Sequence, residues 1–257
     1  MISIGICTEL VNLPEAHALG YDFVETPLDT LATLSDGYFD EFAAWCDGTG
    51  LRVRAVNRLL PEGLDVVGPQ VRAPELHAYL KRAFERCRRL GVQVAVLDAP
   101  LQRTVPGGYD FPLAWRQLGN FLRLIQPHAR ECGMKVAVEP LRKTECNLLN
   151  LVSEATLISG LLQLENVGVA ANTGAMAMAA EGYGTLEQAG SALCHLHVEH
   201  PLTRRMPREA DGEDYWKLMR TLKRCGYKGG VSVTYAKSVD FAADARAALL
   251  CLRQAEH

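Results

Sequence analysis

Glu139 and His197 are the residues whose types and positions are best suited to chemistry. Glu139 ends the apolar run 136–138 and precedes Pro140, so its carboxylate stands beside apolar walls, which is typical of a metal ligand or of a base with a raised pKa. His197 lies two residues after His195, and side chains at this spacing on a strand face the same side. We interpret His195, one layer deeper, as a hydrogen-bonded core histidine. A carboxylate paired with the His197 imidazole would suit a divalent ion such as Mn²⁺, Mg²⁺ or Zn²⁺.

Eight short β-rich runs position these side chains, and each is followed by a longer segment, several with clear helical spacing. This alternation predicts parallel strands joined by right-handed crossovers. Eight such units in 257 residues predict a single (β/α)₈ TIM barrel domain over residues 1–257, with an open doubly wound sheet as the structural alternative. No GxGxxG motif follows the first run, so we expect no nucleotide cofactor. The runs are 2–7, 23–26, 51–57, 92–97, 135–139, 167–171, 195–198 and 231–234.

Glycines mark the turns from helices back into strands. Gly20, Gly50, Gly91 and Gly133 each directly precede or adjoin a predicted strand, where a left-handed residue lets the chain reverse, and Gly226 does the same slightly earlier before the last strand. The clearest helical segments are 73–90, 111–131, 154–164, 214–225 and 241–253.

Polar residues gather at the carboxyl ends of the apolar strands. In a barrel these ends meet at one rim, where the loops after the strands build the active site. The longest of these loops, 58–72, 98–110 and 199–213, follow the third, fourth and seventh runs. We therefore expect a polar mouth lined by Glu25, Asn57, Arg58, Asp98, Glu139, Asn172, residues 197–200, Thr234 and Tyr235.

The composition excludes several classes of function. The net charge is −3 and the basic residues are scattered, which argues against a nucleic-acid partner. No apolar run is long enough to span a membrane, and the amino terminus lacks the pattern of a signal peptide. The eight cysteines are widely spaced without a CxxC pair, as expected for buried free thiols in a reducing cytoplasm.

Four segments together resemble the xylose-isomerase-like TIM-barrel family of sugar and sugar-phosphate isomerases and epimerases. VEPLRKTECNLLN from Val138 is similar to the family's strand-five motif, and HLHVEHP from His195 to its strand-seven motif. GYKGGVSVTY from Gly226 and GYDFVE from Gly20 are weaker matches. The resemblance covers essentially the whole chain, and it implies a small-molecule substrate and a homo-oligomer.

The resemblance implies a metal held by Glu, Asp, His and Glu from strands five to eight, with the two glutamates as the acid/base pair. Glu139 and His197 match. Asn172 stands in place of the Asp, Ala175 in place of a nearby His, and Thr234 in place of the second Glu. Two negative charges are lost from the ligand set, so we expect the divalent metal to be weakly bound or absent. The paired-glutamate proton relay is also incomplete.

The same resemblance assigns substrate contacts to Glu145 and to Arg204 or Arg205 in the strand-seven loop, and Asn57 would orient hydroxyl groups. Glu199 or His200 would supply a second acid. The sequence thus predicts isomerisation or epimerisation of a small sugar, polyol or hydroxy-carbonyl compound by proton abstraction next to a carbonyl, with Glu139 and His197 as catalytic residues. The alternative is a non-catalytic binding barrel that has lost its metal. The related endonuclease branch would need more metal ligands and a basic DNA-binding surface.

Overall fold

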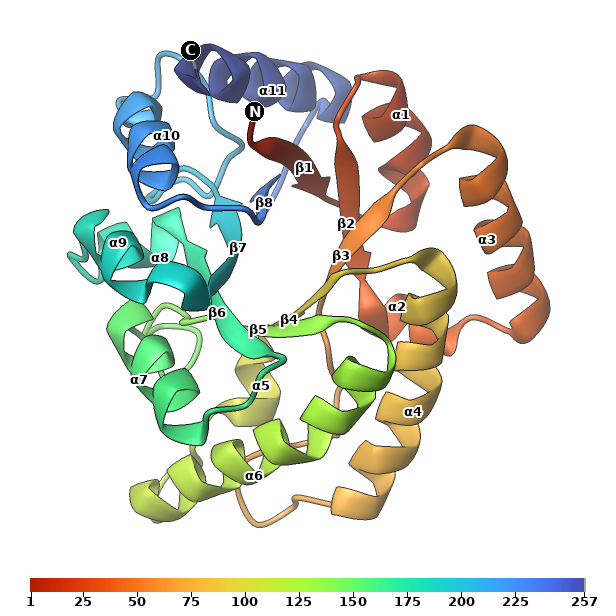
Figure 1. The fold of residues 1–257 in the computed structure, drawn as a ribbon, viewed down its shortest axis with the longest axis vertical. Helices are drawn as coiled ribbons and strands as arrows, with labels where there is room; N and C mark the ends of the chain where they lie inside the picture. Colours follow the sequence, from red (N-terminus) through yellow and green to blue (C-terminus); the bar gives the residue numbers. More distant parts are fainter. Residues whose placement is uncertain (257) are drawn as a thin grey trace.

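Eight parallel strands, each hydrogen-bonded to the next and the last to the first, form a closed barrel (Figure 1). The computed structural model describes residues 1–256. Closure confirms the predicted (β/α)₈ barrel and rules out the open sheet. The strands are β1 Ser3–Cys7, β2 Phe23–Pro27, β3 Val53–Asn57, β4 Val94–Leu97, β5 Lys135–Val138, β6 Val167–Asn172, β7 Leu193–Val198 and β8 Gly230–Val233.

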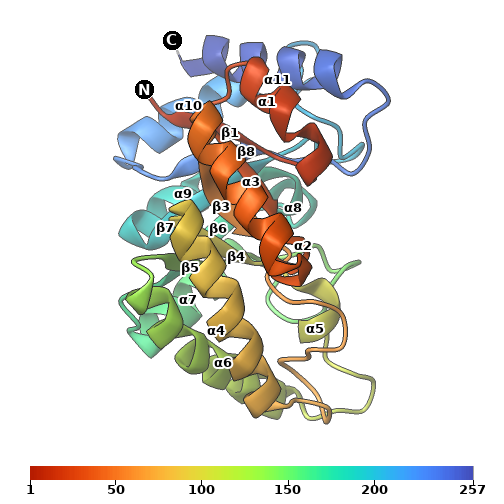
Figure 2. The same cartoon turned by 90° about the vertical axis from the view of Figure 1, so that its right-hand side faces the viewer.

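Helices surround the barrel on all sides (Figures 1 and 2). Two of them, α4 Ala73–Leu90 and α6 Phe111–Glu131, have the predicted bounds, and three others agree within a few residues: α7 Val152–Leu162, α10 Tyr215–Arg224 and α11 Phe241–Glu256. A further helix, α3 Asp36–Thr49, is not among those predicted from the sequence and begins at a Ser35 side-chain cap. The short helices are α1 Leu13–Ala18, α2 Leu28–Thr33, α5 Pro100–Arg103, α8 Thr173–Met178, α9 Gly184–Ala189, and the 3₁₀ turns η1 Leu10–Asn12 and η2 Gly190–Ala192.

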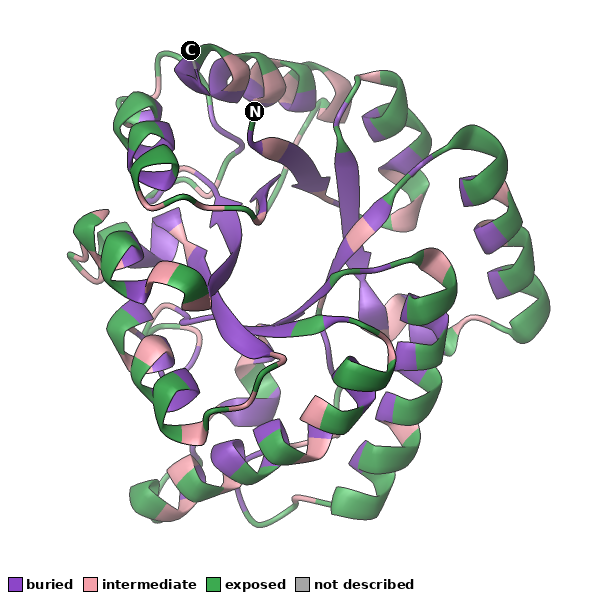
Figure 3. Ribbon diagram, viewed as in Figure 1, coloured by how far each residue is buried: buried purple, intermediate pink, exposed green. Residues whose placement is uncertain are grey.

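The outer helices are amphipathic and bury one face against the barrel (Figure 3). In α4, Leu76, Leu80 and Phe84 are buried at helical spacing, while the opposite face carries solvated charges. The helix ends at Gly91, whose φ of 70° is the left-handed conformation predicted for the turn into β4. Within residues 1–256, no helix is long and apolar enough to cross a membrane.

Phe23 fills the amino-terminal end of the barrel interior. Its ring occupies the space that side chains at Gly5 and Gly230 would take, since a Cβ at either glycine would come within 2.6 Å of a ring carbon. Ala55, Ala137 and Ala170 are among the small residues packed around it. The barrel interior is therefore packed at this end, and within the barrel the space for a ligand lies on the carboxyl-terminal side of Phe23.

Two strands contain an extra residue that changes which side chains face inward. Val24 pairs with Val53 but Glu25 pairs with Ala55, so Arg54 is the bulged residue of β3. The same shift between β6 and β7 leaves Cys194 without a partner in the register. A bulge re-aims the side chains near it.

Candidate active site

A cavity of about 190 Å³ lies at the carboxyl end of the barrel. Its lining draws on residues at or after the carboxyl ends of β3, β4, β5, β6, β7 and β8, whereas Glu25 and Arg58 of the predicted mouth do not line it. The lining includes Asn57, Asp98, Glu139, Asn172, His197 and Thr234.

His197 is held between two carboxylates. Its Nδ1 lies 2.7 Å from Oε1 of Glu139, and its Nε2 lies 2.8 Å from Oε1 of Glu25. Burial by itself would lower the pKa of His197, but the two carboxylates raise this pKa well above its ordinary value. The raised pKa favours the imidazolium form, in which each ring N–H donates to one of the two glutamates.

The same contact decides the ionisation of Glu139. Burial alone would raise the pKa of this carboxyl, but the His197 charge and its hydrogen bond outweigh burial and hold the pKa below its ordinary value. Of the two alternatives predicted for Glu139, a metal ligand or a base with a raised pKa, the raised pKa is wrong, because the sequence could not show that His197 would contact this carboxylate. Oε1 is used by His197, and Oε2 forms no hydrogen bond within residues 1–256.

Glu25 contacts both histidines of β7, which could not be predicted from the sequence. Because β2 continues to Pro27, Glu25 lies below the mouth and is fully buried. Its Oε2 accepts hydrogen bonds from His195 at 2.7 Å and from the Ser232 hydroxyl at 2.6 Å. Burial would raise its pKa, yet the histidines hold this pKa well below the usual range. An acidic residue inside the largely apolar strand 23–27 was the sequence feature that could have indicated a buried, hydrogen-bonded carboxylate. His195 is buried and hydrogen-bonded, as a core histidine should be.

A second group of charges lines the upper part of the cavity. Arg142 donates to Glu199 at 2.7 Å, and Arg204 contacts both Glu199, at 3.4 Å, and Glu145. Burial raises the pKa of Glu199 despite the two arginines that oppose the shift. Gly174 makes the arrangement fit, because a Cβ there would lie 2.7 Å from Glu199 Oε1 and would also overlap the Arg142 guanidinium.

Of the other predicted substrate contacts, only Asn57 lines the cavity. Its amide nitrogen donates to Cys7 Sγ at 2.9 Å, and its oxygen is buried without a hydrogen bond. His200 and Arg205 lie outside the cavity lining. The two His200 ring nitrogens contact Thr203 and Asp211 within the β7–α10 loop, and the Arg205 side chain is exposed. The spacing of His200 and Arg205 in the sequence does not reveal the path of this loop, so it could not show that both side chains lie outside the cavity.

The residues at the family's metal positions do not fit a divalent ion. A histidine ligand must offer a nitrogen lone pair, but both His197 nitrogens face carboxylate oxygens at hydrogen-bond distance. Asn172 Oδ1 accepts from the Ala175 backbone N–H at 3.0 Å and caps α8. Thr234 offers only a neutral hydroxyl. Glu139 is the one charged ligand that remains.

Glu25, His195 and His197 form the one group of three potential metal ligands within residues 1–256, with donor atoms within 4.8 Å of one another. Tetrahedral coordination at bond lengths of about 2.0–2.1 Å separates ligand atoms by about 3.3 Å. The contacts from Glu25 to the two histidines are 2.7 and 2.8 Å. These separations are those of hydrogen bonds, so protons and not a metal ion link the three side chains.

Comparisons with known proteins agree with this architecture. In solved structures, the chain is similar to 3-keto-D-glucoside 4-epimerase from E. coli (18% identity, TM-score 0.85, 99% of this chain and 100% of that one). It is also similar to D-psicose 3-epimerase from Clostridium cellulolyticum H10, solved with D-tagatose (20%, 0.86, 100% of each chain). A third is the IOLI protein with a bound zinc atom (18%, 0.73, 99% and 96%).

At these identities the likeness concerns the fold. No curated protein sequence matches the chain. A family model described as xylose isomerase-like TIM barrel matches residues 13–255. The chain therefore belongs to the xylose isomerase-like TIM barrel family.

Proposed function

We propose that this protein is an isomerase or epimerase that moves a proton at a carbon next to a carbonyl in a small polyhydroxylated substrate. The observation that carries the proposal is Glu139, an ionised carboxylate in the floor of a small polar cavity. His197 fixes one of its oxygens, and the other is available to a ligand. A base that is ionised and oriented before substrate binds is what proton abstraction requires.

The returning proton needs an acid, and two cavity carboxyls have the matching property. Burial raises the pKa of Glu199, and burial followed by the nearby Glu139 charge raises the pKa of Asp98. Where the pKa values of neighbouring carboxyls are shifted apart, the carboxyl with the lower pKa acts as the base and the one with the higher pKa as the acid. Of the two acids named from sequence, Glu199 fits this role and His200 does not, because His200 lies outside the cavity lining.

The developing enediolate oxygen needs positive charge. Arg142 lines the cavity, and its Nε–H is buried without a partner. The Thr234 hydroxyl and the Asn57 amide oxygen are also buried without hydrogen bonds. Buried polar atoms without partners are uncommon in folded proteins. Three of them on residues of one cavity support a ligand rich in hydroxyl and carbonyl groups, with Arg142 stabilising the oxyanion. In this proposal no step depends on a divalent ion.

Solvent isotope exchange tests the proposal. A panel of ketoses and aldoses is incubated in D₂O with EDTA-treated protein, and deuterium at the carbon next to the carbonyl is followed by NMR. We expect incorporation with at least one sugar and a loss on the order of 10²-fold or more in E139Q, the order of magnitude of general-base contributions. E75Q, at an exposed carboxylate on α4, is the matched control. Exchange that appears only with added Mn²⁺ would overturn the metal-independent route.

The second candidate is a non-catalytic binding barrel. It is favoured by the neutral side chains at Asn172 and Thr234, where the resemblance implies two carboxylates. This reading predicts no exchange with any sugar, while a sugar still raises the melting temperature of the folded protein. A stoichiometric divalent ion in the purified protein, measured by elemental analysis, would contradict both the metal-independent route and a binding barrel that has lost its metal.

A further inference from the structure

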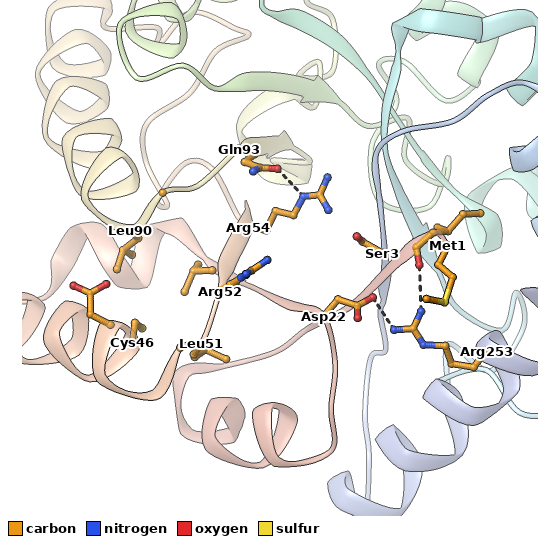
Figure 4. Close-up of a pocket in the computed structure, with 15 residues that line it drawn as sticks. Met1, Ser3, Asp22, Cys46, Leu51, Arg52, Arg54, Leu90, Gln93 and Arg253 are labelled. Carbon is orange, nitrogen blue, oxygen red and sulfur yellow. Dashed lines mark hydrogen bonds and ion pairs between the residues drawn. The ribbon is translucent and has the colours of Figure 1, made fainter.

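The opposite, amino-terminal end of the barrel carries hollows that the proposed reaction does not use. The largest, about 780 Å³, lies between β1, β2, β3 and α11 (Figure 4). Two more, of about 280 and 570 Å³, adjoin it. Arg54 lines all three, which places it at the centre of this face.

Positive charge is concentrated at these hollows although the whole chain has a net charge of −3. Two of the lining carboxylates, Asp22 and Glu256, form ion pairs with Arg253. Within residues 1–256, Arg52, Lys135 and Lys228 form no ion pair. The lining side chains are the cations Arg52, Arg54, Lys135, Lys223, Lys228 and Arg253, and the carboxylates Asp22, Asp47 and Glu256.

Arg54 is fixed in place before any ligand binds. It is the bulged residue of β3, and its guanidinium lies over the Phe23 ring at 5.5 Å. Its Nε donates to Gln93 Oε1 at 2.7 Å, and Figure 4 shows this bond beside the neighbouring Arg52. The terminal nitrogens, which carry four of the five N–H groups, have no partner among residues 1–256. An oriented guanidinium fork with free N–H groups is suited to bidentate recognition of an oxyanion.

Helix carboxyl ends at this face do not account for the two arginines. The ends of α3 and α4 border the largest hollow, and cations often offset the partial negative charge of such ends by bonding to the last carbonyls. Neither Arg52 nor Arg54 donates to a helix carbonyl within the described chain. Arg52 directly precedes β3 and Arg54 is its bulged residue, and both line the largest hollow, which allows both to reach one multiply charged group.

We propose that the hollow around Arg52 and Arg54 binds a small anion that carries phosphate groups. Phosphate fits because it presents several acceptor oxygens and more than one negative charge to two arginines, where a single carboxylate presents one charge. The site lies at the other end of the barrel from Glu139, beyond the packed Phe23 layer. Anion binding at this site can therefore be measured independently of the proposed reaction, and failure of one proposal would not affect the other.

Calorimetric titration with inorganic pyrophosphate at low ionic strength tests the site. We expect saturable binding to the wild-type protein, weakened at least tenfold by R54Q and several-fold by R52Q. R54K keeps the charge but loses the fork, so we expect intermediate affinity. R116Q removes an exposed arginine of α6 that forms no ion pair within residues 1–256, and it should bind as the wild type does.

Two outcomes would overturn the proposal. The first is equal affinity of R116Q, R54Q and the wild type, which would mean unspecific attraction to surface charge. The second is succinate binding as tightly as pyrophosphate, which would contradict recognition of phosphate. R52Q keeps the test valid if R54Q fails to fold, because Arg52 is exposed and forms no side-chain hydrogen bond or ion pair within residues 1–256.

Discussion

Replacing Glu25 by glutamine is the perturbation that tests the buried core of the site. Glu25 is fully buried and accepts hydrogen bonds from His195, His197 and Ser232 at 2.6–2.8 Å. The substitution keeps the shape of the side chain but removes its charge. His197 would then retain one carboxylate partner, Glu139, for an imidazolium that is also buried.

The magnitude follows from this environment. Removing one partner of a buried ion pair costs about 3–5 kcal/mol. Because the amide oxygen that E25Q introduces would still accept a hydrogen bond, we expect a loss near the lower end of this range, about 3 kcal/mol. At about 2–4 °C per kcal/mol for a chain of this size, the melting temperature should fall by about 6–12 °C.

Urea unfolding at pH 6, followed by circular dichroism, measures this loss. E75Q serves as the control, because Glu75 forms an exposed i,i+3 pair with Arg72 and should change stability by less than about 0.5 kcal/mol. In E25Q the pKa of His197, measured by NMR titration, should also fall. A stability change below about 1 kcal/mol together with an unchanged His197 pKa would refute the reasoning, because Glu25 would then not hold an imidazolium.

Three further predictions concern the same scaffold. The lowered pKa values of Glu25 and Glu139 stabilise the fold above the ordinary value of 4.5, and this stabilisation is lost as pH falls through the lowered values. The raised pKa of His197 stabilises the fold fully below 6.5, and this stabilisation is lost as pH rises through the raised value. Unfolding experiments should therefore show the greatest stabilisation by these three residues between about pH 5 and 6.5, and a uniform slope of stability against pH would contradict this prediction. G174A should separate Arg142 from Glu199 and destabilise the protein by about 1–3 kcal/mol in urea, whereas G160A, where a Cβ meets no atom within 4 Å, should not. F23A should lower the free energy of unfolding by about 3–5 kcal/mol, because Gly5 and Gly230 have no side chains to fill the void. It should also weaken pyrophosphate binding, because the Arg54 guanidinium loses the ring that it packs against. Unchanged pyrophosphate affinity would show that the ring does not position Arg54.

The sequence by itself determined the β/α alternation and predicted the barrel. Alternation of short β-rich runs with helical segments is a local pattern, and eight repeats favour a parallel barrel, but the structure decided that the sheet closes. The turns were equally local, since Gly50, Gly91 and Gly133 all adopt the positive φ that their place after a helix predicts. The pairing of Glu139 with His197 also followed, because the carboxyl ends of strands five and seven meet at one rim.

Only the tertiary structure decided what that pair does. Glu25 is separated from His195 by 170 positions, and no spacing rule connects them. Their contact depends on the continuation of β2 to Pro27 and on the register shifts in β3 and β7, which redirect inward-facing side chains. Ionisation depends on these distances as well: burial and neighbouring charge shift a pKa in opposite directions, and which one prevails is set by contacts of a few ångströms that the chain makes only when folded.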